Sequence, residues 1–168
     1  MHALGHETFE ADADSIELSL GAVAAADLVF DHTDSFQGRG LLRGLVRQFL
    51  EQRGIRVAGG SAAACSVADD KFATRRILAR AGIPIAPGAP LDRPDGPVPD
   101  LAWPRVLKAS FEHMSRGVVL VRNERELRDQ AAKLFAEFRQ GLVVEQYVEG
   151  REVGVTVIGR DRVLPPIE

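Results

Sequence analysis

The sequence predicts an α/β protein in two parts: a partial parallel α/β unit at the N-terminus and an α+β lobe in the second half. Before residue 60, two short apolar segments flank a segment with helical apolar spacing, which is typical of a parallel strand–helix–strand unit. The second half alternates apolar strands with turns and one helix, which favours antiparallel hairpins. Residues 59–61 and 84–104, which contain glycine or proline, interrupt the apolar pattern. Two small layered units therefore fit better than one continuous sheet.

The N-terminal unit is expected to form, in order, a strand, a helix, a strand, a helix and a strand, over residues 9–11, 20–26, 28–30, 41–50 and 56–58. Arg53 and Gly54 give the longer helix a basic last turn and a glycine stop. Residues 2–7 have the pattern of a helix that ends just before the first strand.

The second half is expected to form a helix, two strands joined by a loop, another helix and a strand, over residues 71–81, 105–109, 117–121, 123–138 and 142–146. Asp70 is the expected N-cap of the first helix. Asn123 is the expected N-cap of the second, and Glu126 follows three residues later, as in a capping box. Gly141 is expected to close this helix.

The segment 142–152 carries the most informative pattern in the chain. An apolar strand that contains Glu145 runs into a Glu-Gly turn, and Glu152 opens a second strand over 153–158. A strand that ends in water can offer bare backbone N–H and C=O groups to a planar heterocycle, and the two carboxylates can accept from an amine and a ribose hydroxyl. This arrangement suits adenosine.

Two lysines and one loop are candidates for the phosphates. Lys71 opens a helix, where the dipole disfavours a cation unless a phosphate lies nearby. Lys108 follows two apolar strand residues and points either into a cleft or along an exposed edge. Ser115 and Gly117 lie in a loop that can present N–H groups to phosphate oxygens. Each of these residues also has a simpler interpretation as a solvated surface group.

Composition narrows the class of protein. The chain has 168 residues, 45% of them hydrophobic, and a net charge of −3, which is typical of a soluble globular protein. It has no basic tail, so a nucleic-acid partner is not expected. No apolar run approaches the roughly 20 residues of a membrane span, so no membrane partner is expected. A single cysteine excludes an internal disulfide and fits a cytoplasmic location.

The order of these parts resembles the ATP-grasp superfamily, and within it the D-alanine–D-alanine ligase group, over residues 27–168. The resemblance implies an ATP-grasp-type α+β lobe. It divides the chain into a partial N-terminal α/β domain, connecting helices with a proline-rich linker, a small ATP-grasp lobe and the start of a C-terminal lobe, over 1–60, 61–104, 105–148 and 149–168.

The resemblance also implies ATP as cofactor and assigns residues to it. The phosphates would contact Lys71, Lys108, Ser115 and Gly117. Adenine would meet the Glu145 carboxylate and the segment that comprises Gln146, Tyr147 and Val148, and the ribose would meet Glu152. The family activates a carboxylate as an acyl phosphate, which an amine attacks. The resemblance further implies amino-acid substrates and a role in peptidoglycan synthesis, is compatible with the homodimer common in the family, and implies Mg²⁺ for the complete enzyme.

Two departures qualify that expectation. The magnesium ligands of the family lie downstream of the hairpin that closes this chain. For this reason neither a metal site nor a catalytic residue is assigned. The chain is expected to be a fragment that is truncated at both ends. The segment 32–40 lacks the Glu-Asp pair of D-alanine ligases. Membership of the ATP-grasp superfamily is therefore better supported than D-alanine as the substrate. The alternatives are a non-catalytic nucleotide-binding module, another ATP-grasp amino-acid or peptide ligase, and a plain interaction domain.

Overall fold

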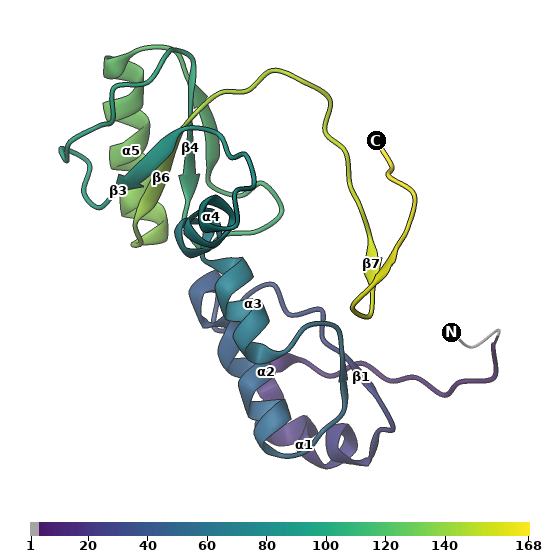
Figure 1. Cartoon of the computed structure of the whole chain (residues 1–168). Coiled ribbons are helices and arrows are strands. Elements are labelled where there is room, and N and C mark those ends of the chain that lie inside the picture. The colour runs from purple at the N-terminus through teal and green to yellow at the C-terminus, as the bar shows by residue number, and fades with distance from the viewer. Residues whose placement is uncertain (1–3) are drawn as a thin grey trace.

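The computed structural model of the chain describes residues 4–168, apart from the side chains of residues 16–19. Its helices are α1 (Ile16–Ala25), α2 (Arg43–Gln52), α3 (Ala62–Asp69), α4 (Lys71–Arg80) and α5 (Glu124–Phe138). Its strands are β1 (Val29–Phe30), β2 (Val57–Ala58), β3 (Gly88–Leu91), β4 (Arg105–Ala109), β5 (Val118–Val121), β6 (Leu142–Gln146), β7 (Val157–Ile158) and β8 (Arg162–Val163). Figure 1 shows α1, α2 and α3 below and the larger sheet with α5 above.

The N-terminal part confirms the predicted parallel strand–helix–strand unit. β1 and β2 pair in parallel, with Val29 opposite Val57. Val23, Val46 and Leu50, which are 4–6% exposed, form the buried core of this unit. Helix α2 reaches this core because its apolar residues recur at the spacing of one helix face.

Three features of the first 70 residues differ from the sequence prediction or lie outside it. The prediction of a strand over 9–11 is wrong, because residues 6–12 have no regular secondary structure. The helix end expected at 2–7 lies partly outside the described residues. Helix α3 lies in the region 61–104 where connecting helices are expected, but only the helix over 71–81 was given bounds. Ser61 caps α3 by accepting a hydrogen bond from the backbone N–H of Ala64 at 3.2 Å.

The second part is a four-stranded sheet in the order β3-β6-β4-β5, with every neighbouring pair antiparallel. Helix α5 packs on one face and buries Leu107, Val121, Leu127 and Val144 completely. The caps expected for α4 and α5 are confirmed: Asp70 accepts from the backbone N–H groups of Phe72 and Ala73, and Asn123 accepts from that of Glu126. This combination of helix and antiparallel sheet is the α+β arrangement that the sequence predicts for the second half.

Strand β3 lies inside the segment that the sequence marks as a proline-rich linker. It pairs only with β6, at the edge of the sheet. Because proline has no N–H to donate, an edge strand is the place in a sheet where Pro90 is tolerated.

The hairpin expected after residue 142 is wrong. Strand β6 pairs with β3 on one side and with β4 on the other, so neither of its edges is free for residues 153–158. Those residues extend away from the sheet (Figure 1), and only Val157 and Ile158 form a strand, β7, which pairs with β8.

Gly117, at the end of the β4–β5 loop, is required by the packing. Its φ is +67°, and a Cβ atom there would lie 2.7 Å from Ala109 Cβ and 3.1 Å from Phe138 Cε2. A larger residue would be strained and would also push against helix α5.

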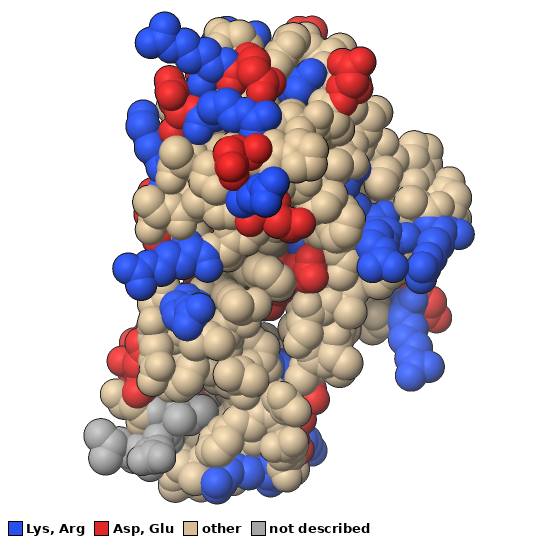
Figure 2. Space-filling view, turned by 90° about the vertical axis from the view of Figure 1, so that its left-hand side faces the viewer, with Lys and Arg blue, Asp and Glu red and all other residues tan. Residues whose placement is uncertain are grey.

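Charged side chains of both signs are interspersed on the face that Figure 2 shows. Within residues 4–168, none of the helices combines the length and the apolar character that a membrane crossing requires.

Candidate functional site

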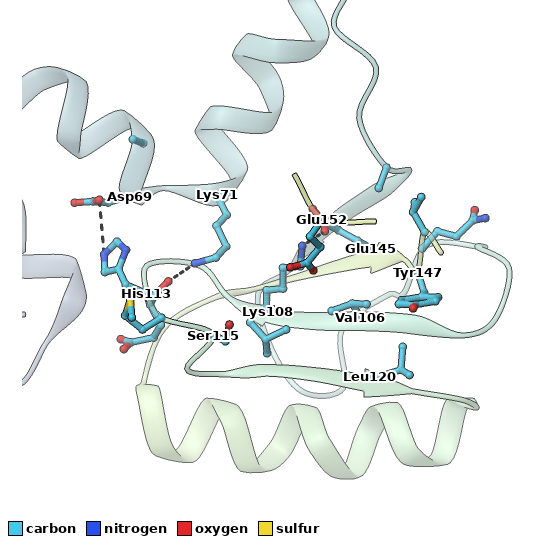
Figure 3. A pocket seen from close by; sticks show the side chains of 17 residues that line it. Asp69, Lys71, Val106, Lys108, His113, Ser115, Leu120, Glu145, Tyr147 and Glu152 are labelled. Atoms are coloured by element: carbon cyan, nitrogen blue, oxygen red, sulfur yellow. Dashed lines mark hydrogen bonds and ion pairs between the residues drawn. The ribbon is translucent and has the colours of Figure 1, made fainter. Parts of the chain in front are cut away.

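A cavity of about 630 Å³ lies against the face of the sheet that α5 leaves uncovered (Figure 3). At one end, Val106, Leu120 and Tyr147 provide apolar surface. At the other end lie polar side chains from three segments of the chain: Asp69, Lys71, His113 and Ser115. The cavity can therefore accept a molecule with a flat apolar part and an anionic part.

Strand alternation determines which side chains reach the cavity. In β4, Val106 and Lys108 line the cavity, whereas Leu107 and Ala109 are fully buried in the core with α5. Arg105 also lies away from the cavity, where it donates to the Leu101 carbonyl and stacks 3.9 Å over the Trp103 ring. The sequence left open whether Lys108 faces a cleft or an edge, and the structure has it facing the cleft.

Two cations hold the carboxylate of Glu145. Arg75 Nη1 lies 2.5 Å from Oε1, and Lys108 Nζ lies 2.5 Å from Oε2. Arg75 also donates from Nη2 to the Ala86 carbonyl at 2.6 Å. The Arg75 and Glu145 side chains are only 12% and 11% exposed, whereas that of Lys108 is 32% exposed. Arg75 is thus the fixed partner of Glu145, and Lys108 is the one with access to solvent.

Lys71 lies at the polar end of the cavity. Its Nζ donates to the backbone carbonyl of Glu112. Burial lowers the pKa of Lys71, and the nearby charge of Lys108 lowers it further. An anion bound beside Lys71 would offset both effects, because it favours the charged ammonium.

The β4–β5 loop adopts a backbone conformation that is uncommon for its residues. Met114 and Ser115 have φ values of +51° and +60°. Glu112, two residues before Met114, is 6% exposed and accepts a hydrogen bond from Gln140 Nε2 at 2.9 Å. Non-glycine residues in the left-handed region are enriched at functional sites, where the surrounding structure holds them in place.

The backbone of residues 146–148, which is expected to meet the edge of adenine, is only partly free. The N–H of Gln146 donates to the Pro87 carbonyl at 2.9 Å and that of Tyr147 to the Pro104 carbonyl at 3.0 Å, so neither is bare. Among the described residues, no group accepts from the N–H of Val148. This leaves Val148 as the backbone donor of the segment.

The cavity brings together nearly all the predicted site residues: Lys71, Lys108, Ser115, Glu145, Gln146, Tyr147, Val148 and Glu152. Gly117 lies outside its lining and faces α5 instead. Arg75 and Asp69 also line or border this site but were not predicted, because nothing in the sequence shows that Arg75 reaches Glu145 or that Asp69, just before the capping Asp70, faces the cavity. The one sequence signal for Arg75 as a site residue is that it follows Lys71 by one helical turn and so lies on the same side of α4.

Among residues 4–168 there is no cluster of three or more histidine, cysteine or acidic side chains that would suit a metal ion. The described residues therefore do not provide a site for the Mg²⁺ that the family resemblance implies.

Comparison with known proteins identifies the family. The model of the family described as "D-ala D-ala ligase C-terminus" matches residues 77–168, more than half of the chain. The chain belongs to the D-Ala–D-Ala ligase family. The resemblance found in the sequence is thereby confirmed.

Individual D-Ala–D-Ala ligases agree with this result. The enzyme of Desulforudis audaxviator is 35% identical over 132 residues, which are 74% of this chain and 43% of that protein. The structure of the Bacillus anthracis D-Ala–D-Ala ligase complexed with ATP matches with a TM-score of 0.74 at 21% identity, over 92% of this chain and 50% of that one. The VanG D-Ala:D-Ser ligase of Enterococcus faecalis matches with a TM-score of 0.67 at 26% identity, over 83% and 41%. The chain spans about half the length of these relatives.

Proposed function

We propose that this chain binds ATP in the cavity, as the nucleotide-binding part of an ATP-dependent carboxylate–amine ligase. The observation that carries the proposal is the polarity of the cavity. Apolar side chains lie at one end, Lys71 and Ser115 lie at the other, and the paired Lys108 and Glu145 lie between them. This order matches the order of base, sugar and phosphates in the nucleotide.

Different residues of the cavity bind the adenine, the ribose and the phosphates. Adenine lies between Val106 and Tyr147, its exocyclic amine donates to Glu145, and its ring nitrogen accepts from the N–H of Val148. Glu152 accepts from a ribose hydroxyl. Lys108 leaves Glu145, which Arg75 continues to hold, and moves to the phosphates.

The chemistry proposed for the complete ligase follows from the charges at the polar end. A substrate carboxylate attacks the γ-phosphorus, the bond to the β-phosphate oxygen breaks, and ADP leaves. An amine then attacks the acyl carbon, an amide forms and phosphate leaves. Fixed ammonium groups such as that of Lys71 stabilise the negative charge on the phosphate oxygens. Amino acids are the proposed substrates and the cytoplasm the proposed location.

Isothermal titration of the chain with ATP and with GTP, each with and without Mg²⁺, tests the proposal. We expect ATP to bind more tightly than GTP. Lys108→Met should weaken ATP binding about tenfold or more, because it removes a charge-assisted hydrogen bond. Lys133→Met is the matched control, since Lys133 is an exposed lysine of α5 outside the cavity lining. Absence of binding, or equal reductions in the two variants, would contradict the proposal.

The second candidate is a module that binds nucleotide without catalysis. The lack of a metal-binding cluster among the described residues favours it. A coupled assay for ADP separates the two: release of ADP when amino acids and Mg²⁺ are added would favour the ligase, whereas the module predicts ATP binding without ADP release.

A further inference from the structure

Lysine is rare in this chain. The sequence has 21 lysine and arginine residues, and only three of them are lysines: Lys71, Lys108 and Lys133. Lys71 and Lys108 line the cavity, whereas Lys133 is exposed on α5. A guanidinium stays charged at all ordinary pH values, so only a lysine side chain can provide an uncharged amine. The cavity therefore contains two of the three side-chain amines that can act as nucleophiles.

The two lysines of the cavity have different partners. Lys108 Nζ lies 2.5 Å from Glu145 Oε2, in an ion pair with a carboxylate. Within the described part of the chain, no carboxylate forms an ion pair with Lys71, whose Nζ donates to the uncharged carbonyl of Glu112. An uncharged amine can donate the same hydrogen bond and keep its lone pair free. Lys71 can therefore lose a proton without breaking an ion pair.

The charges around Lys71 come from α3, the β4–β5 loop, β4 and β6. They are those of Asp69, Glu112, Lys108 and Glu145. The three carboxylates favour the ammonium, but an arginine nitrogen lies 2.5–3.5 Å from each of them and offsets its charge. Burial and the positive charge of Lys108 act in the opposite direction, and together they lower the pKa of Lys71. Burial and a neighbouring cation are the two conditions that make a lysine nucleophilic.

Small molecules can reach the amine of Lys71. Figure 3 shows its side chain extending from the start of α4 into the cavity. The cavity volume of about 630 Å³ leaves ample room for a small acyl phosphate. The Lys108 side chain is 32% exposed and attracts the negative charge of such a molecule. An acyl phosphate that enters the cavity is therefore drawn toward Lys71.

We infer that Lys71, beside the charge of Lys108, is a site of acylation by acyl phosphates when the cavity holds no nucleotide. The uncharged amine of Lys71 attacks the acyl carbon and forms an N–C bond. The bond from that carbon to the phosphate oxygen breaks, phosphate leaves with the electron pair, and the nitrogen releases a proton to water. The product is an uncharged amide, so the cavity loses one of its two lysine charges.

Acylation of Lys71 and binding of ATP should oppose each other. The acylation site rests on the cavity alone, whereas this effect on the nucleotide rests on the proposed function. A phosphate bound beside Lys71 favours its ammonium form, so ATP both covers the amine and keeps it unreactive. Conversely, an acylated Lys71 no longer makes a charge-assisted hydrogen bond to phosphate, which should weaken ATP binding about tenfold. Acyl phosphates would thereby inactivate the nucleotide site.

The test incubates the wild-type chain with acetyl phosphate and follows the acetylation of each lysine by peptide mass spectrometry. Without nucleotide, we expect Lys71 to be acetylated severalfold faster than Lys133, the exposed lysine of α5. Saturating ATP should slow the reaction at Lys71 and leave the reaction at Lys133 unchanged. A rate at Lys71 no higher than that at Lys133 in the absence of nucleotide would overturn the inference.

Two variants test the contribution of Lys108. Lys108→Met removes the positive charge that disfavours the ammonium of Lys71 and attracts the reagent, so acetylation of Lys71 should slow severalfold. Arg80→Met is the matched control, because Arg80 is an exposed cation of α4 outside the cavity lining. Equal rates in the wild type and Lys108→Met, or equal slowing by the two variants, would contradict the inference.

The outcomes separate this inference from the proposed function. If titration shows that ATP binds but Lys71 reacts no faster than Lys133, the inference is wrong and the proposed function stands. If Lys71 reacts faster and ATP neither binds nor protects it, the acylation site stands and the proposed function is wrong. Lys71→Gln, which carries an uncharged amide, tests the consequence for the nucleotide. It should bind ATP about tenfold more weakly than the wild type, and an unchanged affinity would refute the proposed inactivation.

Discussion

Replacing Arg75 with methionine removes the guanidinium that holds Glu145 from one side. The substitution breaks the ion pair at 2.5 Å to Glu145 Oε1 and the hydrogen bond at 2.6 Å to the Ala86 carbonyl. Both side chains of the ion pair are nearly buried, and breaking a buried pair by removing one partner costs about 3–5 kcal/mol. Lys108 still pairs with Oε2, so the free energy of unfolding should fall by an amount near the lower end, about 3 kcal/mol.

Lys108→Met is the matched comparison. It removes the other cation from the same carboxylate, but the Lys108 side chain is 32% exposed and Arg75 remains in place. Pairs open to solvent contribute about 0–1 kcal/mol, so we expect the free energy of unfolding to fall by about 1 kcal/mol or less. The two variants thus differ mainly in the burial of the cation that is removed.

Urea unfolding followed by the fluorescence of Trp103 measures both changes in stability. Trp103, the one tryptophan of the chain, stacks with Arg105 of β4 and therefore reports on the four-stranded sheet. The midpoint should fall clearly for Arg75→Met and slightly for Lys108→Met, with unchanged slopes. A destabilisation by Arg75→Met no greater than that by Lys108→Met would refute the idea that burial determines which cation anchors Glu145.

Three further predictions concern single residues. Gly117→Ala should lower the free energy of unfolding by about 2–4 kcal/mol, because of its positive φ and the close approach of Ala109 and Phe138 described above, whereas Gly150→Ala, with open space around it, should change it little; thermal unfolding measures both. Because the pKa of Lys71 is lowered on folding, its charge destabilises the fold at neutral pH and this penalty disappears as the pH rises to the ordinary value of 10.5. The stability of Lys71→Met relative to the wild type should therefore decrease between neutral pH and 10.5, and a pH-independent difference in urea unfolding would contradict this. Glu145→Gln should lower the preference for ATP over GTP about fivefold, since the amide is a weaker acceptor for the amine; competition titration measures the ratio, and an unchanged ratio would argue against the adenine contact.

Local patterns account for the elements that sequence analysis predicted correctly. Strand β4 begins and ends at the predicted residues, and Asp70 and Asn123 cap their helices as expected. In each case the signal lies within a few neighbouring residues, in apolar periodicity or in a cap.

The errors come from pairings between residues far apart in the chain. The hairpin after β6 was a reasonable local expectation, but β3, from a much earlier part of the chain, occupies that edge of the strand. Nothing local to Gly88–Leu91 indicates a strand, because Pro90 argues against one. The domain boundaries drawn from the sequence stay a prediction.

In the candidate site, too, the residues with local sequence signals were predicted and those that depend on distant contacts were not. Lys71, Lys108 and Glu145 were chosen because each stands in a recognisable motif, and all three line the cavity. Arg75 acts across 70 residues, through its ion pair with Glu145. The shielding of His113 Nε2 and its distance of 3.7 Å from Asp69 Oδ1 arise only in the folded chain.

The position of Glu145 affects how this protein can evolve. Glu145 lies on β6, between strands β3 and β4 and next to the fully buried Val144, so a substitution there alters the interior of the sheet together with the proposed contact to adenine. Tyr147 and Val148, just beyond the strand, are 42% and 65% exposed. Changes at these two positions leave the interior intact. Natural variants that prefer a different base should therefore differ first at the exposed end of this segment, and retain the acid and its arginine long after the preference has shifted.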